Sequence, residues 1–333
     1  MARIMPNERS ISDSFYHEEH EEHERKNAFL LGSSCSSCSS WFIIVGMYQQ
    51  KTVTQILARA ALALTPASAT PRLDAELLLA HVLGWTRARL LAAGREALTP
   101  EQQATFGALV ARRQNLEPVA YITGYREFYG LEFEVTPATL VPRPETELLV
   151  DLALQHVRQR TTGNKQPLRV ADIGTGTGCI AVGFAVNYPQ ARIVAVDLSP
   201  AALAVARRNV ARHGLAERVM LLEGDLLAPL TVPIDLLLSN PPYVVMDEID
   251  ENVRRHEPHL ALDGGEGGLE VYCRLLAQAP AKLAVGGTIM VEIGAWQGAA
   301  VAELGASHFP YACIAIHQDL AGHDRVVVIE QPV

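Results

Sequence analysis

The residues of this 333-residue chain with the clearest chemical potential are Ser-Asn-Pro-Pro-Tyr at 239–243, directly after the apolar run 234–238. Proline fixes its own φ angle, has no N–H and holds the preceding residue in an extended conformation. We therefore expect Asn240 to be extended and the carbonyl of Pro241 to stay outside ordinary strand pairing. The side-chain oxygen of Asn240 and this carbonyl are two fixed acceptors, which suit the two donors of an –NH2 group. Tyr243 is expected to lie against a planar substrate; the alternative is a proline turn with Tyr243 as packing.

A second motif, Asp-Ile-Gly-Thr-Gly-Thr-Gly at 172–178, ends another predicted strand and opens a predicted helix. Alternate glycines let the backbone turn tightly and approach a ligand at the helix N-terminus. Nineteen residues beyond Gly178 the next predicted strand ends at Asp197, whose carboxylate can accept hydrogen bonds from ribose hydroxyls. A nicotinamide-binding loop is the rival interpretation, but its G-x-G-x-x-G spacing requires glycine where Cys179 stands. The observed spacing, with an acid two residues before the first glycine, resembles motif I of methyltransferases.

Together the two motifs predict methyl transfer from S-adenosyl-L-methionine to a planar nitrogen. Such a nitrogen is a poor nucleophile because its lone pair is delocalised into the neighbouring carbonyl or ring. Two acceptors can hold its –NH2 group facing the sulfonium methyl and stabilise the positive charge that develops during transfer. Alignment of the reacting atoms roughly 3–3.5 Å apart supplies much of the remaining rate enhancement. No strong general base is required before transfer, because the methylated nitrogen becomes acidic.

The elements that must position these motifs alternate between helix and strand from residue 144 onward, which predicts a mainly parallel sheet with helices on both faces. Ligands bind such sheets at the carboxyl ends of the strands. The predicted strands are 168–173, 192–197, 219–222, 234–239, 288–293, 312–317 and 325–329, and the predicted helices are 145–158, 180–187, 200–213, 269–283 and 298–306. Another acid near a strand end, Asp225, followed by Leu226, is expected to meet an adenine edge.

The chain before residue 144 has a different character. Its first part contains the low-complexity runs HEEHEEHE and SSCSSCSS, which cannot build a core, and we hypothesise that translation starts at Met47. Helical periodicity follows, with a capped helix start at Thr99-Pro100. The predicted divisions are 1–46, a disordered or mis-annotated extension; 47–115, a helical domain; 116–143, a linker with a hairpin formed by 126–129 and 131–135; and 144–333, the α/β domain.

Composition limits the classes of function. The net charge of −9 argues against sequence-independent binding to duplex DNA, which needs a basic surface. Apolar runs are too short for a transmembrane helix, so no membrane partner is expected. Five scattered cysteines are typical of reduced thiols in a cytoplasmic protein. Cys35 and Cys38 form a lone CxxC without a second pair downstream, so no metal site is expected.

The wider sequence closely resembles the release factor glutamine methyltransferases, the HemK-like family. The segments that carry this resemblance are 117–124, 126–128, 140–147, 257–258, 264–265 and 267–269. It covers essentially the whole chain from Met47 onward. The resemblance implies a class I Rossmann-like methyltransferase domain with a seven-stranded, mainly parallel sheet, and an N-terminal helical domain that helps to grip a class 1 peptide chain release factor. It also implies methylation of the side-chain amide nitrogen (N5) of glutamine in the Gly-Gly-Gln motif of that factor, a step in translation termination.

The resemblance also implies roles for individual positions. The implied S-adenosyl-L-methionine site comprises Gly174, Thr175, Gly176, Thr177, Gly178, Asp197, Asp225, Leu226 and Asn240. The implied catalytic and glutamine-binding residues are Asn240, Pro241, Pro242 and Tyr243, with Arg143 at the border of the pocket. Many relatives have tryptophan where Leu226 stands, so a backbone contact with adenine is the expectation there. In the alternative interpretation of the Arg143 stretch, this arginine pairs with Glu147 and Pro144 begins a helix.

Two other functions stay open at this point. The first is an amino-nitrogen methyltransferase acting on RNA or DNA bases, for which Arg207, Arg208, Arg212, Arg254 and Arg255 provide candidate contacts. Solvated helix faces are the simpler explanation of these arginines, and the acidic balance argues against a nucleic-acid partner. The second is a non-catalytic binding module, which would be expected to have lost Asn240 or the glycines. A monomer is the expected oligomeric state.

Overall fold

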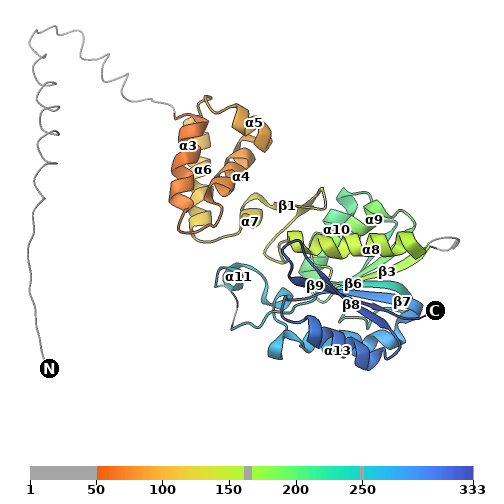
Figure 1. The fold of residues 1–333 in the computed structure, drawn as a ribbon. Helices are drawn as coiled ribbons and strands as arrows, with labels where there is room; N and C mark the ends of the chain where they lie inside the picture. Colours follow the sequence, from red (N-terminus) through yellow and green to blue (C-terminus); the bar gives the residue numbers. More distant parts are fainter. Residues whose placement is uncertain (1–50, 161–166, 248, 250, 333) are drawn as a thin grey trace, which may run out of the picture. The chain divides into compact units, whose positions relative to one another are not determined.

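The structure, a computed structural model, describes residues 51–160, 167–247, 249 and 251–332. The interpretation of residues 1–46 and of a start at Met47 falls outside these described residues. Figure 1 shows a helical part at the start of the described chain, a hairpin, and a sheet covered by helices. The described helices include none that is long and apolar enough to span a membrane.

The helical part is built from helices that share one buried cluster of apolar side chains. Its helices are α3 (Val53–Leu64), α4 (Pro71–Leu83), α5 (Arg87–Ala92) and α6 (Pro100–Gln114). Thr99 and Gln102 form the predicted capping box at the start of α6, since each side chain accepts a hydrogen bond from the other residue's backbone N–H. The buried side chains of Leu57, Leu78 and Phe106 belong to one shared cluster, so packing between helices stabilises this part.

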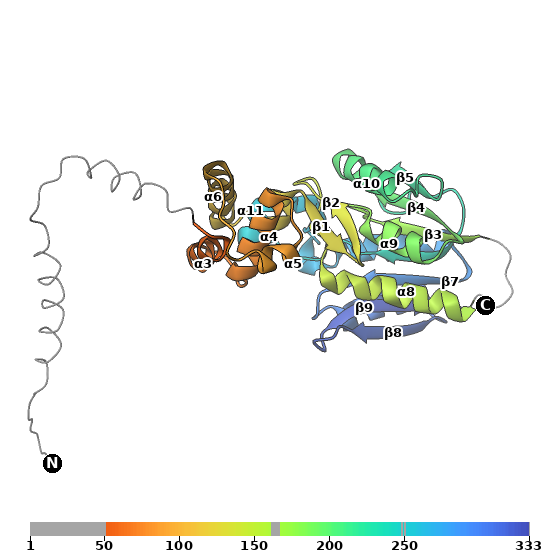
Figure 2. The ribbon, with the colours of Figure 1, turned by 90° about the horizontal axis from the view of Figure 1, so that it is seen from above.

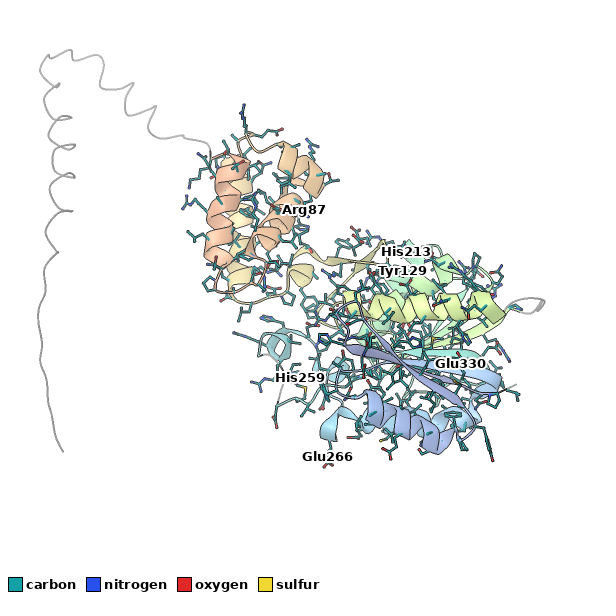
Figure 3. The ribbon with its side chains drawn as sticks, in the orientation of Figure 1. Arg87, Tyr129, His213, His259, Glu266 and Glu330 are labelled. Atoms are coloured by element: carbon teal, nitrogen blue, oxygen red, sulfur yellow. The ribbon has the colours of Figure 1, made fainter. Side chains whose placement is uncertain are left out.

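The linker contains a short helix, α7 (Val119–Thr123), and then the hairpin of β1 (Tyr125–Phe128) and β2 (Leu131–Glu134). Its two-residue turn, Tyr129-Gly130, has φ angles of +56° and +70°, the combination that a type I′ turn requires. The Tyr129 N–H donates to Glu147 Oε1 at 2.8 Å. The Nε2 of His213 lies 3.0 Å from the Glu132 carbonyl oxygen, a hydrogen-bonding distance. Figure 3 labels Tyr129 and His213 in this region. These contacts attach the hairpin to helix α8 (Glu147–Arg160) and to the C-terminal end of helix α10 (Pro200–Arg212) in the α/β domain.

Within the described residues, seven strands form a sheet of order β5-β4-β3-β6-β7-β9-β8. The strands are β3 (Leu168–Ile173), β4 (Ala191–Asp197), β5 (Val219–Glu223), β6 (Ile234–Ser239), β7 (Leu283–Glu292), β8 (Cys313–Gln318) and β9 (Asp324–Glu330). All pairs from β5 to β7 are parallel, whereas β9 runs antiparallel to both β7 and β8. Figure 2 shows these strands from above. The predicted mainly parallel sheet is confirmed.

Helices cover both faces of this sheet, as its alternating side chains require. Val170 belongs to a cluster with side chains of α8 (Glu147–Arg160), α9 (Cys179–Asn187) and α10 (Pro200–Arg212). The next residue, Ala171, belongs to the opposite cluster, with side chains of α12 (Glu270–Gln278) and α13 (Gly298–His308). In Figure 1, α8 lies above the sheet and α13 below it.

The predicted helix 269–283 is wrong in its last third, after residue 278. Helix α12 ends at Gln278, a 3₁₀ turn covers Ala279–Ala281, and β7 begins at Leu283 rather than at residue 288. Pro280 lies in that turn. If α12 continued through it, Pro280 would have no N–H to donate and its ring would clash with the preceding turn, so the helix ends before it. Similarly, Pro144 begins a 3₁₀ turn, η1 (Pro144–Thr146), before α8. The short helix α11 (Glu251–His256) was not predicted.

Candidate active site

A cavity of about 350 Å³ lies at the carboxyl ends of β3, β4 and β6. Parallel strands end at one edge of a sheet, so residues distant in the sequence meet there. Among the predicted site residues, those lining it are Arg143, Gly174, Thr175, Gly176, Thr177, Asp197, Asp225, Leu226, Asn240 and Pro242. In the described chain Gly178, Pro241 and Tyr243 are not among the lining residues.

The glycine loop is fixed by backbone bonds to the neighbouring strand. The N–H groups of Gly174 and Thr175 both donate to the Val196 carbonyl, at 2.9 and 3.0 Å. Gly174 and Gly176 have φ angles of +73° and +55°, which a side chain would disfavour. Gly176 N–H donates to Asp197 Oδ2 at 2.8 Å, so the loop and the second strand end are joined at the cavity.

Asp197 is oriented by two backbone donors. Its Oδ1 accepts from Ser199 N–H at 2.8 Å, in addition to the bond from Gly176 at Oδ2. Burial raises the pKa of this carboxyl above its usual value, although the backbone donors oppose the effect. Each carboxylate oxygen has a second lone pair, so Asp197 can still accept bonds from hydroxyls of a ligand in the cavity.

Gly178 lies at the start of helix α9, and it is not one of the residues that line the cavity in the described chain. It is the N-cap of α9 with φ +80°, and a Cβ placed on it would lie 3.5 Å from the Cβ of Ala206 in α10. Its absence of a side chain therefore serves the left-handed turn that starts α9 alongside α10.

Asp172 is a buried carboxylate that the sequence singled out only as the acid of the glycine motif. Its Oδ2 accepts from the Thr175 hydroxyl at 2.6 Å and from Ala181 N–H at 3.2 Å, which ties the loop to α9. Among the described residues its Oδ1 is buried without a partner, and burial raises the pKa of Asp172 to about 7. Asp172 therefore stabilises the glycine loop through these hydrogen bonds and does not line the cavity.

Asn240 is the first residue after strand β6, and it lines the cavity. Its Nδ2 donates to the Thr146 hydroxyl at 3.1 Å. The described part of the chain provides no donor to Asn240 Oδ1 or to the Pro241 carbonyl. Because the amide nitrogen is turned toward Thr146, the oxygen is the atom that we expect Asn240 to offer to a ligand in the cavity.

Tyr243 packs into the molecule. Its ring lies against the cluster that contains Tyr272 and Leu276, and its hydroxyl donates to Glu292 Oε1 at 3.4 Å. A Cβ on Gly268 would come within 2.3 Å of the Tyr243 carbonyl oxygen, so the glycine permits close approach of these two backbones. This placement agrees with the packing alternative, and a direct contact of Tyr243 with substrate stays a prediction.

Arg143 pairs with Glu257, and the predicted alternative pairing with Glu147 is wrong. Glu257 is 4% exposed and accepts from both the Arg143 guanidinium and Val141 N–H. Glu147 Oε1 instead accepts from the backbone of Tyr129. Sequence analysis missed Glu257 as a site residue, because its partners lie 114 and 116 positions away.

Asp225 and Leu226 line another wall of the cavity. The Asp225 carboxylate forms an ion pair with Arg274. Leu226 has φ +49°, a left-handed conformation that is strained for a branched-chain residue. Such strain concentrates at functional sites, where the surrounding structure holds it.

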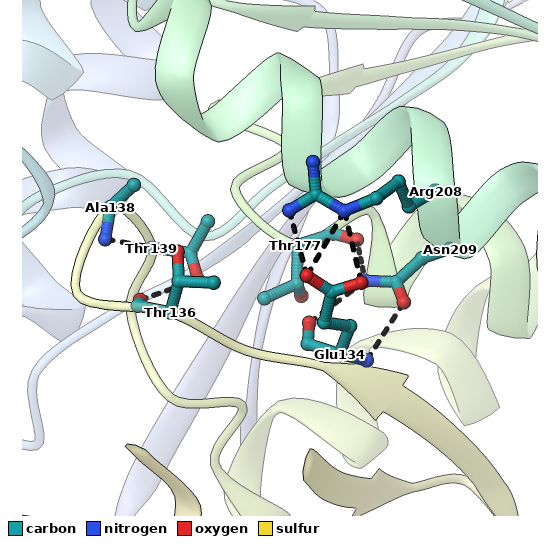
Figure 4. A network of polar contacts seen from close by, with 7 residues as sticks. All are labelled: Glu134, Thr136, Ala138, Thr139, Thr177, Arg208 and Asn209. Carbon is teal, nitrogen blue, oxygen red and sulfur yellow. Dashed lines mark hydrogen bonds and ion pairs between the residues drawn. The ribbon is translucent and has the colours of Figure 1, made fainter. Parts of the chain in front are cut away.

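A buried amide connects the hairpin to the glycine loop (Figure 4). Asn209 of α10 is fully buried; its Oδ1 accepts from Glu134 N–H at 2.8 Å. Its Nδ2 donates to the carbonyls of Glu134 and Thr177 at 3.0 and 2.9 Å. The Glu134 carboxylate also accepts three hydrogen bonds from Arg208, and Arg212 pairs with Glu132. Arg208 and Arg212, two of the arginines considered as RNA contacts, therefore form ion pairs with the hairpin.

In the described ranges no group of three or more His, Cys, Asp or Glu side chains is arranged to hold a metal ion. The fold and the glycine loop at the strand ends define a class I, Rossmann-like methyltransferase. The chain matches the family model described as the PrmC N-terminal domain over residues 55–124. It matches the model described as the methyltransferase small domain over residues 148–257.

Full-length relatives identify the family. A release factor glutamine methyltransferase from Moorella thermoacetica is 43% identical over 259 residues, covering 77% of this chain and 89% of the relative. One from Cereibacter sphaeroides is 44% identical over 263 residues, covering 78% and 91%. A crystal structure of a release-factor-specific protein-(glutamine-N5) methyltransferase from Alicyclobacillus acidocaldarius is 30% identical, covering 60% of this chain and 100% of that chain, with a TM-score of 0.37. The chain belongs to the release factor glutamine methyltransferase family.

Proposed function

We propose that this protein methylates the side-chain amide nitrogen (N5) of the glutamine in the Gly-Gly-Gln motif of class 1 peptide chain release factors, with S-adenosyl-L-methionine as the methyl donor. The observation that carries the proposal is the arrangement of Asn240. Its amide nitrogen is bonded to Thr146, which leaves its oxygen as an acceptor at the cavity. The names of the relatives at 39–44% identity support the choice of glutamine in a release factor.

The residues around the cavity fit the proposed cofactor. A volume of about 350 Å³ is within the range of roughly 300–1,000 Å³ that small-molecule sites occupy. Gly174 and Gly176 bring backbone close to the cavity, and Asp197 presents an oriented carboxylate to ribose hydroxyls. The Asp225–Leu226 wall is proposed to border the adenine. When bound, S-adenosyl-L-methionine supplies an electrophilic methyl whose bond to sulfur breaks with the electron pair left on sulfur.

The protein's own groups would make the glutamine nitrogen reactive. Asn240 Oδ1 and the Pro241 carbonyl each accept a hydrogen bond from one N–H of the glutamine amide, and these two bonds fix the amide in one orientation. As the new C–N bond forms, positive charge grows on the nitrogen, and both acceptors stabilise that charge. They are already oriented before reaction, so little reorganisation is needed. The methylated nitrogen then loses one proton to solvent and returns to a neutral amide.

We further propose that residues 47–115 form the helical domain that contacts the release factor, that 116–143 link it to the methyltransferase domain at 144–333, and that Arg143 borders the glutamine pocket. The ion pair of Arg143 with buried Glu257 supports the last assignment, since it holds the guanidinium at the cavity wall. A cytoplasmic monomer is the state proposed for the active protein.

The decisive experiment incubates the protein with radiolabelled S-adenosyl-L-methionine and either a class 1 release factor, the same factor with Ala in place of the motif glutamine, or ribosomal and transfer RNA. We expect label only in the unmodified factor. Asn240→Ala should lower turnover by about 10²–10³-fold, as expected for removal of one oriented charge-stabilising group. Cofactor affinity, measured by calorimetry, should stay largely unchanged.

The matched control is Asn187→Ala, which removes an exposed asparagine whose Nδ2 donates to the carbonyl of Gly183 in its own helix. This variant should turn over like the wild type. Labelled RNA, or near-normal turnover by Asn240→Ala, would contradict the proposed function.

A further inference from the structure

We infer that Glu292 and Thr146 are positioning residues that set the direction of the Asn240 amide, so that its oxygen rather than its nitrogen faces the substrate. This inference rests on the proposed function, because it assigns the groups that prepare Asn240 for the glutamine amide. Thr146 lines the cavity beside Asn240, whereas Glu292 lies behind it, and both act through Asn240.

The three side chains form a series that begins at the cavity with Asn240 and leads inward through Thr146 to Glu292. Asn240 Nδ2 donates to Thr146 Oγ1 at 3.1 Å. The Thr146 side chain also faces the Glu292 carboxylate and lowers its pKa. Thr146 is 2% exposed and Glu292 is 1% exposed. Solvent is therefore excluded from both contacts, and the direction of each hydrogen bond is determined by the protein groups alone.

The sheet register explains why Glu292 lies beside Asn240. Ser239 of β6 is paired with Val291 of β7, so the next residue of each parallel strand, Asn240 and Glu292, emerges at the same level. The 3₁₀ turn η1 brings Thr146 to this point from a third segment of the chain. The arrangement therefore follows from the strand topology.

Counting hydrogens fixes the direction of the series. A threonine hydroxyl has one hydrogen, and an ionised carboxylate can only accept. The hydrogen of Thr146 must therefore point to Glu292, which leaves the Thr146 oxygen to accept from Asn240. The alternative, a flipped amide with its oxygen toward Thr146, would require that single hydrogen for Asn240 and would turn the –NH2 of Asn240 toward the –NH2 of the substrate. Two donor groups would then face each other.

The charge on Glu292 controls this direction. Burial raises the pKa of Glu292 to about 7, while the bond from Thr146, the charge of Arg325 and the Tyr243 hydroxyl oppose the rise. The other titratable groups facing it are Glu145, the buried Cys179 thiol, and Tyr272, whose hydroxyl donates to the Glu292 backbone carbonyl at 2.7 Å.

Within the described chain Glu292 Oε2 is buried without a partner. A proton on Oε2 would convert Glu292 into a potential donor, and the direction of the series would no longer be fixed. The acidic side of the pH–kcat profile should therefore fall as the pH drops through about 7.

The test compares Thr146→Val, Thr146→Ser and Glu292→Gln with the wild type. The measurements are kcat and KM for the release factor, the pH dependence of kcat, and two calorimetric affinities: that for S-adenosyl-L-methionine, and that for the release factor in the presence of S-adenosylhomocysteine. Thr146→Val keeps the size of the side chain and removes the hydroxyl; we expect kcat to fall by about tenfold or more with little change in KM, as for loss of an oriented group in the transition state.

Thr146→Ser restores the hydroxyl and should recover kcat to within about threefold of the wild type. Glu292→Gln keeps the size of the carboxyl but cannot ionise, so kcat should fall and the acidic limb near pH 7 should disappear. Cofactor affinity should be unchanged in all three variants. Ser307→Ala, which removes an exposed hydroxyl bonded to the carbonyl of Leu304, is the control and should match the wild type.

The outcomes separate this inference from the proposed function. If the wild type labels no release factor, the proposed function fails. If the wild type is active but Thr146→Val equals it, or Thr146→Ser is as impaired as Thr146→Val, the positioning role is overturned. Should Thr146→Val lose cofactor binding through misfolding, Glu292→Gln decides, since a retained acidic limb in that variant overturns the inference.

Discussion

Replacing Asn209 by leucine should destabilise the protein and weaken cofactor binding together. The amide is fully buried and bonds to the N–H and carbonyl of Glu134 and to the carbonyl of Thr177. Leucine has a similar volume, so the substitution removes the hydrogen bonds without leaving a large cavity. Each buried polar group that loses its partner costs about 1–3 kcal/mol, so three of them should lower the free energy of unfolding by roughly 3–9 kcal/mol.

The loss should reach the cavity because Thr177 lines it and belongs to the glycine loop. We expect the affinity for S-adenosyl-L-methionine, measured by calorimetry at a temperature where the variant is folded, to fall by about tenfold, or roughly 1.4 kcal/mol. Urea titration followed by circular dichroism measures the change in unfolding free energy. Asn187→Leu, a substitution of an exposed asparagine, is the matched control and should change stability by no more than about 0.5 kcal/mol. A loss below about 1 kcal/mol in Asn209→Leu would refute the claim that this amide joins hairpin and loop.

Three further predictions concern the strand ends. Asp197→Ala removes the acceptor of the Gly176 and Ser199 N–H groups and should weaken cofactor binding by about tenfold or more in calorimetry; an unchanged affinity would show that this carboxylate does not contact the ligand. Because burial raises the pKa of Asp172 to about 7, the native state binds more protons than the unfolded state between about pH 4 and 7, and stability falls as the pH rises through that window. Asp172→Asn should therefore lose less unfolding free energy than the wild type between pH 5 and pH 7.5, and equal losses in urea titrations would contradict the assignment. Gly178→Ala should cost about 1–2 kcal/mol, because φ is +80° while the nearest atom lies at an ordinary contact distance of 3.5 Å; a neutral effect on the urea midpoint would show that the backbone relaxes.

Periodicity and turn chemistry predicted most of the fold. The strands from Leu168 to Ile329 were predicted to within a few residues, because each alternates with a helical segment of clear periodicity. The main error was the start of β7, which was predicted at residue 288 and lies at Leu283. Ala, Leu and Val are compatible with either helix or strand, so the apolar pattern alone did not show where α12 ends. The short helices α5, α7 and α11 have six residues or fewer, which is too little sequence for a helical period to be recognised.

For the site, local motifs predicted what lies at the strand ends but not what holds it there. Asn240 and the glycine loop were found because their chemistry is contained in a few consecutive residues. Glu257 and Glu292 were missed as partners of Arg143 and Thr146, since those contacts depend on the tertiary fold. Asp172 was recognised as part of a motif, although its burial and unpaired oxygen became apparent only in three dimensions.

The position of β9 in the sheet affects how the chain can assemble. Although β9 follows β8 in the sequence, it lies between β7 and β8 and pairs with both. While the polypeptide is being synthesised, β8 emerges from the ribosome before the strand that must attach it to the sheet, and the open edge of β7 stays exposed until β9 appears. Nascent chains halted before Asp324 should therefore keep β8 sensitive to protease, and the α/β domain should close only in the last stage of synthesis.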